Sequence, residues 1–146
     1  MNEEFTVDID GLSLTESFEG CKLTAYRDLG GVLTIGYGHT GMDVYEGRTI
    51  THDEAVDLLR EDMAVAEGCI KRYVKVPLTQ HQFDALVDFA FNVGIGNFKH
   101  STLLAHLNSG YLSGAEAEFQ KWDTVNGSVV AGLLRRRQAE TKLFDS

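Results

Sequence analysis

The sequence has little of the residues that interrupt helices or cross-link small extracellular folds. Its 146 residues include one proline and two cysteines. Proline will therefore rarely break a helix, and two cysteines are too few for a disulfide framework. Free thiols are expected at Cys21 and Cys69, although a single bridge between them stays open.

Long apolar runs and a targeting segment are also missing. No stretch approaches the roughly 20 apolar residues that a membrane-spanning helix needs, so stable membrane insertion is not expected. The first residues, MNEEFTVDIDG, carry neither a basic segment nor an apolar run. No signal peptide is therefore expected.

An excess of basic residues is missing as well, since the formal net charge is −9. Residues 1–67 carry 15 acidic and 4 basic residues, whereas residues 68–146 carry 7 and 9. This asymmetry indicates either a solvated acidic face or a C-terminal half that meets an anionic polymer. Nucleic-acid-binding proteins usually show a basic footprint, so no nucleic-acid partner is expected. The five histidines lack the spacing of metal ligands, and no metal or cofactor is predicted.

The pattern of apolar residues predicts one domain over residues 1–146, of the α+β class and mostly helical. Residues of about 1–50 are expected to form a helix and a small β-hairpin lobe, and residues of about 51–146 a helical lobe. Strands are predicted at 23–27 and 32–37, joined by a turn, and a glycine turn at 94–97. Helices are predicted at 8–19, 52–67, from a break at Gly68 to about 74, and at 80–93, 101–108, 113–121 and 133–144.

Three residues near the N-terminus suggest a hydrolytic site. Glu19 ends the first predicted helix, where the negative end of the helix dipole favours the protonated carboxylic acid. A protonated acid can give its proton to a leaving group. Asp28 lies in the predicted hairpin turn and Thr34 on the returning strand. Each is also an ordinary surface, turn or strand residue, so their joint spacing carries the hypothesis.

That spacing resembles the signature of phage lysozymes, the endolysins of the T4 and P22 lysozyme type. The family pattern is a glutamate, eight residues, an aspartate or cysteine, five residues and a threonine, and Glu19, Asp28 and Thr34 follow it without departure. The resemblance spans roughly residues 12–144. Further matching blocks are 77–86, 91–94, Phe98 with 101–104, 107–110 and 132–140.

The resemblance implies a lysozyme-like fold with an active-site cleft between two lobes. Glu19 then looks like the general acid, Asp28 like the residue that positions or activates the attacking water, and Thr34 like the hydroxyl that holds this water. Aspartate rather than cysteine at position 28 favours an inverting hydrolysis. Inverting glycosidases hold their two carboxyl groups about 6.5–9.5 Å apart, against about 5–5.5 Å in retaining ones.

The resemblance also suggests supporting and substrate-binding residues. Arg136 matches an arginine that pairs with the catalytic glutamate, and His39 looks like a structural histidine that fastens the β-lobe through hydrogen bonds. Three consecutive helical residues point about 100° apart, so Arg135, Arg136 and Arg137 do not all face one cleft. The residues expected to contact substrate are Thr40, Phe91, Asn92, Phe98 and Ser101.

The expected function is hydrolysis of the β-1,4 bond between N-acetylmuramic acid and N-acetylglucosamine in bacterial peptidoglycan, which lyses the host cell. The protein is expected to act as a monomer and to stay in the host cytoplasm until a holin releases it to the cell wall. One alternative is a lytic transglycosylase, which needs the glutamate but no water-positioning carboxylate. Another is a non-catalytic peptidoglycan-binding module. Asp28 and Thr34 at the family spacing argue against both.

Overall fold

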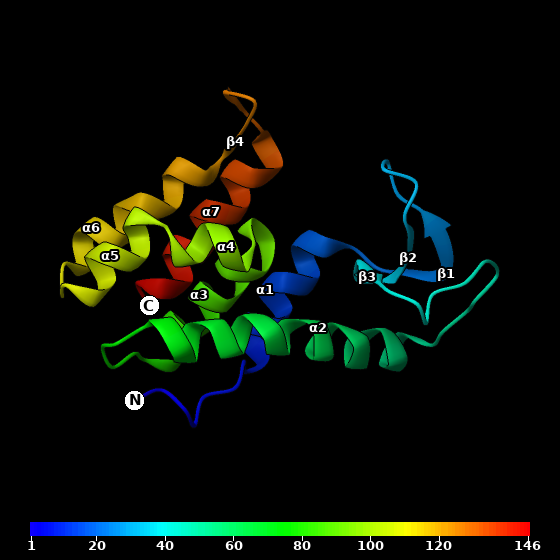
Figure 1. Cartoon of the computed structure of the whole chain (residues 1–146), viewed down its shortest axis with the longest axis horizontal. Coiled ribbons are helices and arrows are strands. Elements are labelled where there is room, and N and C mark those ends of the chain that lie inside the picture. The colour runs from blue at the N-terminus through cyan, green and yellow to red at the C-terminus, as the bar shows by residue number, and fades with distance from the viewer. The chain divides into compact units, whose positions relative to one another are not determined.

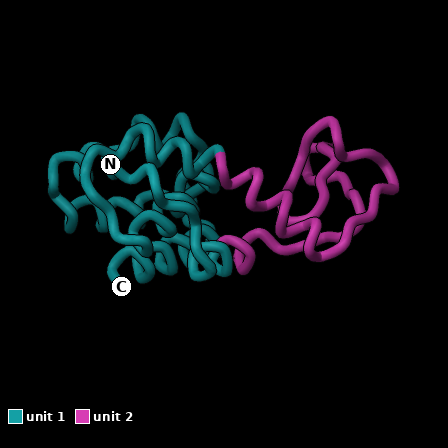
Figure 2. Tube along the Cα trace, turned by 90° about the horizontal axis from the view of Figure 1, so that it is seen from below, with its two compact units in different colours: residues 1–14, 65–146 teal, residues 15–64 magenta.

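The computed structural model describes residues 1–146, which form helices and two small antiparallel sheets (Figure 1). The chain divides into two compact units (Figure 2). Unit 1 comprises residues 1–14 and 65–146, and unit 2 comprises residues 15–64. The sequence was expected to divide into two lobes near residue 50. The two units instead divide within helices α1 (Ile9–Glu19) and α2 (His52–Tyr73), each of which contributes residues to both units.

Unit 2 is built on a three-stranded sheet in the order β1 (Lys22–Arg27), β2 (Leu33–Gly36) and β3 (His39–Thr40). Thr34 lies opposite Tyr26 on β1 and opposite Thr40 on β3. The two predicted strands are confirmed. The third was not predicted, because two residues are too few to show an alternating pattern.

Helix α2 continues through Gly68, so the predicted break at this residue is wrong. A glycine inside a helix costs about 1 kcal/mol relative to alanine. The residues that follow it bury apolar surface, since Ile70 is 0% and Val74 2% exposed. Their burial outweighs the cost of the glycine. At its other end, α2 starts with the expected capping box, in which Thr51 and Glu54 exchange hydrogen bonds.

Unit 1 contains the remaining helices, most of them where the sequence predicts them. A capping box between Thr79 and Gln82 opens α3, as expected. Within the predicted turn at 94–97, Gly94 has a positive φ of 98°, but residues 95–97 belong to a short helix. An unpredicted hairpin joins the last two helical segments. The elements are α3 (Gln80–Val93), α4 (Ile95–Lys99), α5 (Thr102–Asn108), α6 (Leu112–Glu118), the 3-10 helix η1 (Phe119–Trp122), β4 (Thr124–Val125), β5 (Ser128–Val129) and α7 (Ala131–Phe144).

The core of unit 1 is centred on Phe89 of α3. Its ring meets three others edge to face, with centroids 5.2–6.2 Å apart: Phe98, Phe119 and Trp122. Such edge-to-face pairs add to the free energy gained by burying apolar area.

No helix combines the length and apolar character needed to span a membrane. Both cysteines are free thiols, with Cys69 buried and Cys21 exposed.

A buried carboxyl group anchors the start of α1 within unit 1. Asp84 of α3 is 0% exposed and accepts hydrogen bonds from the Asp8 backbone N–H (3.3 Å) and the Gln80 side chain (2.8 Å). A Cβ at Gly11 would lie 2.7 Å from the Asp84 side chain, so this approach requires glycine. Burial raises the pKa of Asp84 from 3.8 to about 6.

Asp84→Asn is expected to stabilise the protein at neutral pH but not at pH 4. Because the pKa of Asp84 is higher folded than unfolded, the native state loses stability as pH rises from about 4 through 6. Asparagine removes that loss, which amounts to at most about 3 kcal/mol. Chemical denaturation of both proteins between pH 4 and 8 measures the difference. A stability change that is the same at every pH would contradict the prediction.

Candidate active site in unit 2

The three predicted catalytic residues all belong to unit 2. Glu19 is the last residue of α1 and is partly buried. The helix ends there because Gly20 adopts a positive φ of 67°, which is accessible to glycine at little cost. Because Glu19 ends the helix, its carboxyl group lies at the negative end of the helix dipole, as the sequence predicts. No basic residue in the last turn of α1 offsets this negative end.

Asp28 is held in a tight turn between β1 and β2. Its Oδ1 atom accepts hydrogen bonds from the backbone N–H groups of Gly30 and Val32, both at 2.9 Å. Gly31 closes the turn by donating its N–H to the Asp28 carbonyl at 2.9 Å. The side chain is exposed, and because both bonds go to Oδ1, the second carboxylate oxygen remains available to a ligand.

Thr34 is linked to Asp28 through one backbone carbonyl. The Val32 carbonyl accepts the Thr34 hydroxyl at 2.9 Å and the Asp28 backbone N–H at 3.0 Å. Thr34 is only 4% exposed. Because its single proton is given to Val32, the hydroxyl oxygen can act only as an acceptor toward a water molecule.

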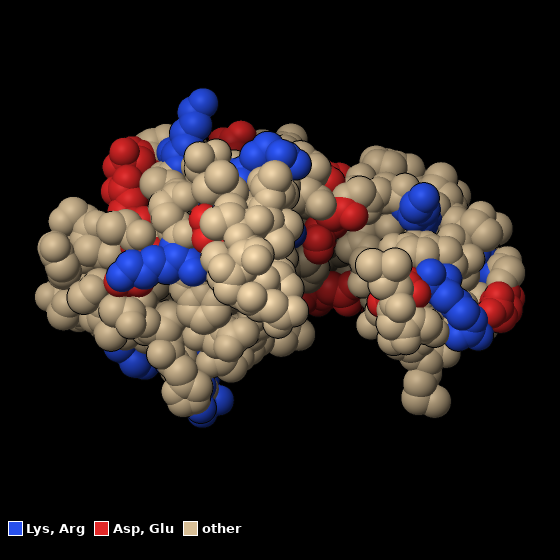
Figure 3. Space-filling model, turned by 90° about the horizontal axis from the view of Figure 1, so that it is seen from above, with Lys and Arg blue, Asp and Glu red and all other residues tan.

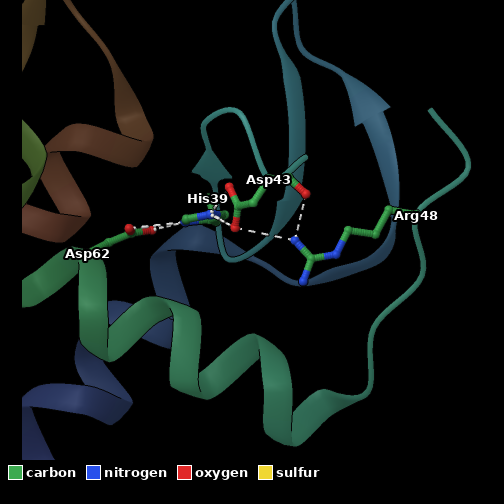
Figure 4. A network of polar contacts seen from close by, with 4 residues as sticks. All are labelled: His39, Asp43, Arg48 and Asp62. Carbon is green, nitrogen blue, oxygen red and sulfur yellow. Dashed lines mark hydrogen bonds and ion pairs between the residues drawn. The ribbon is translucent and has the colours of Figure 1, made fainter. Parts of the chain in front are cut away.

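His39 fastens the sheet of unit 2 to α2 (Figure 4). Its Nδ1 lies 2.9 Å from Asp62 Oδ2 on α2, and its Nε2 lies 2.9 Å from Asp43 Oδ2. Arg48 in turn binds Asp43 at 3.3 Å. Burial alone would lower the pKa of His39, but the two carboxylates outweigh it and raise the pKa. The same contact with His39 lowers the pKa of Asp43. These bonds agree with the structural role that the resemblance suggests.

Asp62→Asn is expected to destabilise the protein most near pH 5–6. A histidine whose pKa is raised on folding contributes stability below its unfolded pKa, about 6.5, and loses it as pH rises through the folded value. Removing the Asp62 charge is expected to cost about 1.5–3 kcal/mol in that window and less at pH 8. Thermal melts of Asp62→Asn and of the exposed control Asp57→Asn measure this. An equal loss at pH 5.5 and pH 8 would contradict it.

The predicted substrate contacts lie in both units. Thr40 is exposed on β3 of unit 2. In unit 1, Asn92 accepts a hydrogen bond from Arg137 at 2.8 Å, Phe98 is 0% exposed, and Ser101 caps α5 by accepting the Leu104 N–H. Phe98 and Ser101 thus have structural roles, whereas Phe91 is partly exposed. Contact of these residues with substrate stays a prediction.

Arg136 is buried in unit 1, where its guanidinium binds both oxygens of Asp88 at 2.8 and 2.9 Å. A two-point contact of this kind fixes the plane of the guanidinium. Its neighbours differ, since Arg137 is buried and Arg135 exposed, as expected for consecutive helical residues. The predicted pairing of Arg136 with Glu19 joins residues of different units and stays a prediction.

Charges on the face shown in Figure 3 give no sign of a further site, because the Lys and Arg side chains there are dispersed rather than gathered into one basic surface. No group of three or more His, Cys, Asp or Glu side chains is arranged to hold a metal ion. Sequence reasoning missed Asp43 and Asp62 as parts of this region. Both are ordinary members of a set of 22 acidic residues, and only their packing around His39 distinguishes them.

Comparisons with known proteins agree with this architecture. The family model described as Phage lysozyme matches residues 16–140. An endolysin of Bacillus phage PZA is 46% identical over 93% of the chain, which spans only 54% of that relative. An endolysin of Acyrthosiphon pisum secondary endosymbiont phage 1 is 46% identical, with 93% and 95% covered. The crystal structure of a P22 lysozyme mutant superposes with a TM-score of 0.90 at 37% identity, covering 97% of this chain and 99% of that one. Further relatives, at 36–42% identity, are named SAR-endolysins.

Proposed function

Since the chain belongs to the phage lysozyme family, we propose that it is an endolysin that hydrolyses the β-1,4 bond between N-acetylmuramic acid and N-acetylglucosamine in peptidoglycan. The family membership and the lysozyme-like fold confirm the two corresponding predictions from the sequence. The chain spans about half the length of two of the curated relatives, so the activity is a proposal for this chain itself.

The observation that carries the proposal is the fixed pair of Asp28 and Thr34. Glycoside hydrolysis by inversion needs a base that activates a water on one face of the sugar and an acid that protonates the leaving oxygen on the other. The Val32 carbonyl accepts hydrogen bonds from both the Asp28 backbone N–H and the Thr34 hydroxyl, and each residue keeps one side-chain oxygen that can accept a proton from a water. Glu19, at the helix end of the same unit, is the proposed acid.

In the proposed reaction, Glu19 gives its proton to the glycosidic oxygen as the bond to the anomeric carbon breaks. Water attacks that carbon from the opposite face and passes a proton to Asp28. The products are two shorter glycan strands, one with a new reducing end. Proton exchange with solvent then returns Asp28 to the carboxylate and Glu19 to the acid, so the net reaction consumes one water and needs no cofactor.

Digestion of purified sacculi followed by mass spectrometry tests this reaction. Hydrolysis predicts reducing muramic acid ends on the released fragments. A lytic transglycosylase would instead leave anhydro ends, lighter by one water. A non-catalytic binding module would sediment with the sacculi and release no fragments.

For the route to the cell wall, we propose that a holin releases the protein from the host cytoplasm. We also propose that the protein acts as a monomer. Identity to the relatives named simply endolysin, 45–46%, exceeds the identity to the SAR-endolysins, which is at most 42%. Expression of the chain without a holin is expected to leave cells intact until the membrane is permeabilised. Lysis on expression alone would instead favour a route like that of the SAR-endolysins. Sedimentation equilibrium tests whether the protein is a monomer in solution.

A further inference from the structure

Three basic side chains gather at the C-terminal end of α2, in unit 1. Arg72 and Lys99 both lie over the ring of Tyr73, with the Arg72 Cζ atom and the Lys99 Nζ atom each 5.4 Å from its centroid. Lys75 donates a hydrogen bond from Nζ to the Arg72 carbonyl at 2.6 Å. All three side chains are exposed. We refer to Arg72, Lys75 and Lys99 as the α2-end cluster.

Contacts within unit 1 hold the α2-end cluster in place. A cation within about 6 Å of an aromatic centroid is attracted to the ring, so Tyr73 brings together two charges that repel each other. Asn108, at the end of α5, fixes the segment after α2. Its Oδ1 accepts the Lys75 backbone N–H at 2.7 Å, and its side-chain amide donates to the Tyr73 carbonyl at 2.8 Å. Groups fixed in advance lose less conformational freedom when they bind a partner.

No carboxylate of the protein forms an ion pair with the α2-end cluster, although acidic residues outnumber basic ones by 22 to 13. The Lys and Arg side chains that do form ion pairs are Arg27, Arg48, Lys121, Arg136 and Arg137. The cluster belongs to residues 68–146, the half of the chain with 9 basic and 7 acidic residues. Unpaired cations gathered at one place favour an interpretation in which this half meets an anionic polymer.

Peptidoglycan, the polymer of the proposed function, is such a partner. Its negative charges are the carboxylates of its stem peptides, whereas its glycosidic bonds are neutral. The net charge of −9 opposes the approach of the protein to this polymer. At physiological salt a charge acts over only about 8 Å, so a local group of cations can attract carboxylates despite the overall charge. Guanidinium and ammonium groups also donate hydrogen bonds to carboxylates, which strengthens the contact.

We propose that the α2-end cluster is an attachment surface for peptidoglycan, on which Arg72, Lys75 and Lys99 bind stem-peptide carboxylates. It retains the enzyme on the insoluble polymer between cleavages, whereas the proposed catalytic residues belong to unit 2. The choice of polymer rests on the proposed function. Attachment itself is measured without any cleavage.

Cosedimentation with purified sacculi in a Glu19→Gln background measures attachment without digestion. Replacing all three residues of the α2-end cluster by Gln is expected to lower the affinity about tenfold at low salt, because exposed ion pairs are individually weak and only their sum is large. The remaining binding is expected to depend less on salt. The matched control removes the same charge from three exposed cations on separate elements: Lys22→Gln, Arg60→Gln and Lys142→Gln. It is expected to change the affinity less than about twofold.

Sacculi whose carboxyl groups have been converted to amides test the chemistry of the partner. On these sacculi the parent is expected to bind as weakly as the variant of the α2-end cluster. Equal affinity of the parent and this variant for untreated sacculi would overturn the inference. An equal loss in the matched control would overturn it too, because that result reports net charge alone. A difference that persists after amidation, and disappears when hydrofluoric acid removes phosphodiester-linked polymers, would assign the surface to those polymers instead.

Activity gives a second measurement. With Glu19 intact, the variant of the α2-end cluster is expected to raise KM for sacculi about tenfold and to leave kcat unchanged, since only binding is lost. A fall in kcat at unchanged KM would contradict an attachment role. An inactive wild type would refute the proposed function, and cosedimentation would still decide whether the α2-end cluster binds peptidoglycan.

Discussion

Glu19→Gln is expected to lower kcat for peptidoglycan cleavage by about 10²–10⁴-fold, the range typical for loss of a general acid. Glutamine has nearly the same shape but no proton to give, so the leaving oxygen would depart as an alkoxide. Since glutamine occupies the same space at the end of α1, KM and the melting temperature are expected to change little. Turbidity loss of purified sacculi and a thermal melt measure these quantities.

Glu61→Gln is the matched control, because it makes the same chemical change at an exposed position of unit 2. It is expected to leave kcat unaltered. Lysis by Glu19→Gln at the rate of this control would remove Glu19 from the reaction. Lysis lost together with the cooperative melt would show that Glu19 is needed for folding rather than for chemistry.

Glu140→Leu is expected to destabilise the protein by about 3–5 kcal/mol, the usual cost of leaving a buried charge without its partner. Arg137 and Glu140 of α7 are both 0% exposed, with Arg137 Nε 2.7 Å from Glu140 Oε1. Burial lowers the pKa of Arg137 and raises that of Glu140, which reflects the cost of keeping both charges away from water. Arg137 also stacks over Phe89, 5.1 Å from its centroid, and has no surface exposed to solvent.

Urea denaturation of Glu140→Leu measures this loss. Gln138→Leu places the same side chain at an exposed position of α7 and is expected to change the free energy of unfolding by no more than about 0.5 kcal/mol. Adding Arg137→Met to Glu140→Leu is expected to recover much of the stability, because the unpaired cation is then gone. A single Glu140→Leu variant as stable as wild type would mean that the pair makes no net contribution.

Local signals in the sequence were sufficient for most of the secondary structure. Both capping boxes were visible as a threonine followed three residues later by Glu or Gln, and both are present. The two longer strands of unit 2 and the ends of α3 were placed correctly for the same reason. These features depend on residues close together in the chain, and a sequence displays such residues directly.

The errors had two sources: burial that outweighs local preference, and strands too short to show a pattern. Gly68 looked like a helix break, but the apolar residues after it draw the helix onward. The β4–β5 hairpin was overlooked although Asn126 and Gly127, with φ values of 52° and 82°, are a common hairpin-turn pair. Its strands of two residues each are too short to show periodicity.

For the candidate site, the sequence supplied the residues but not their bonding. Glu19, Asp28 and Thr34 were identified by spacing and resemblance. The Val32 carbonyl that joins Asp28 to Thr34 contributes through its backbone, which carries no sequence signal. Likewise, His39 was expected to be structural, but its partners Asp43 and Asp62 become evident only when the chain is folded.

The most direct measurement of the central claim is the configuration of the anomeric carbon at the moment of cleavage. Proton NMR of a glycan oligomer during early digestion distinguishes the two anomers before they interconvert. A water held by Asp28 and Thr34 opposite the acid Glu19 predicts that the α-anomer forms first from the β-linked substrate. First formation of the β-anomer, or of an anhydro end with no free anomer, would contradict the account.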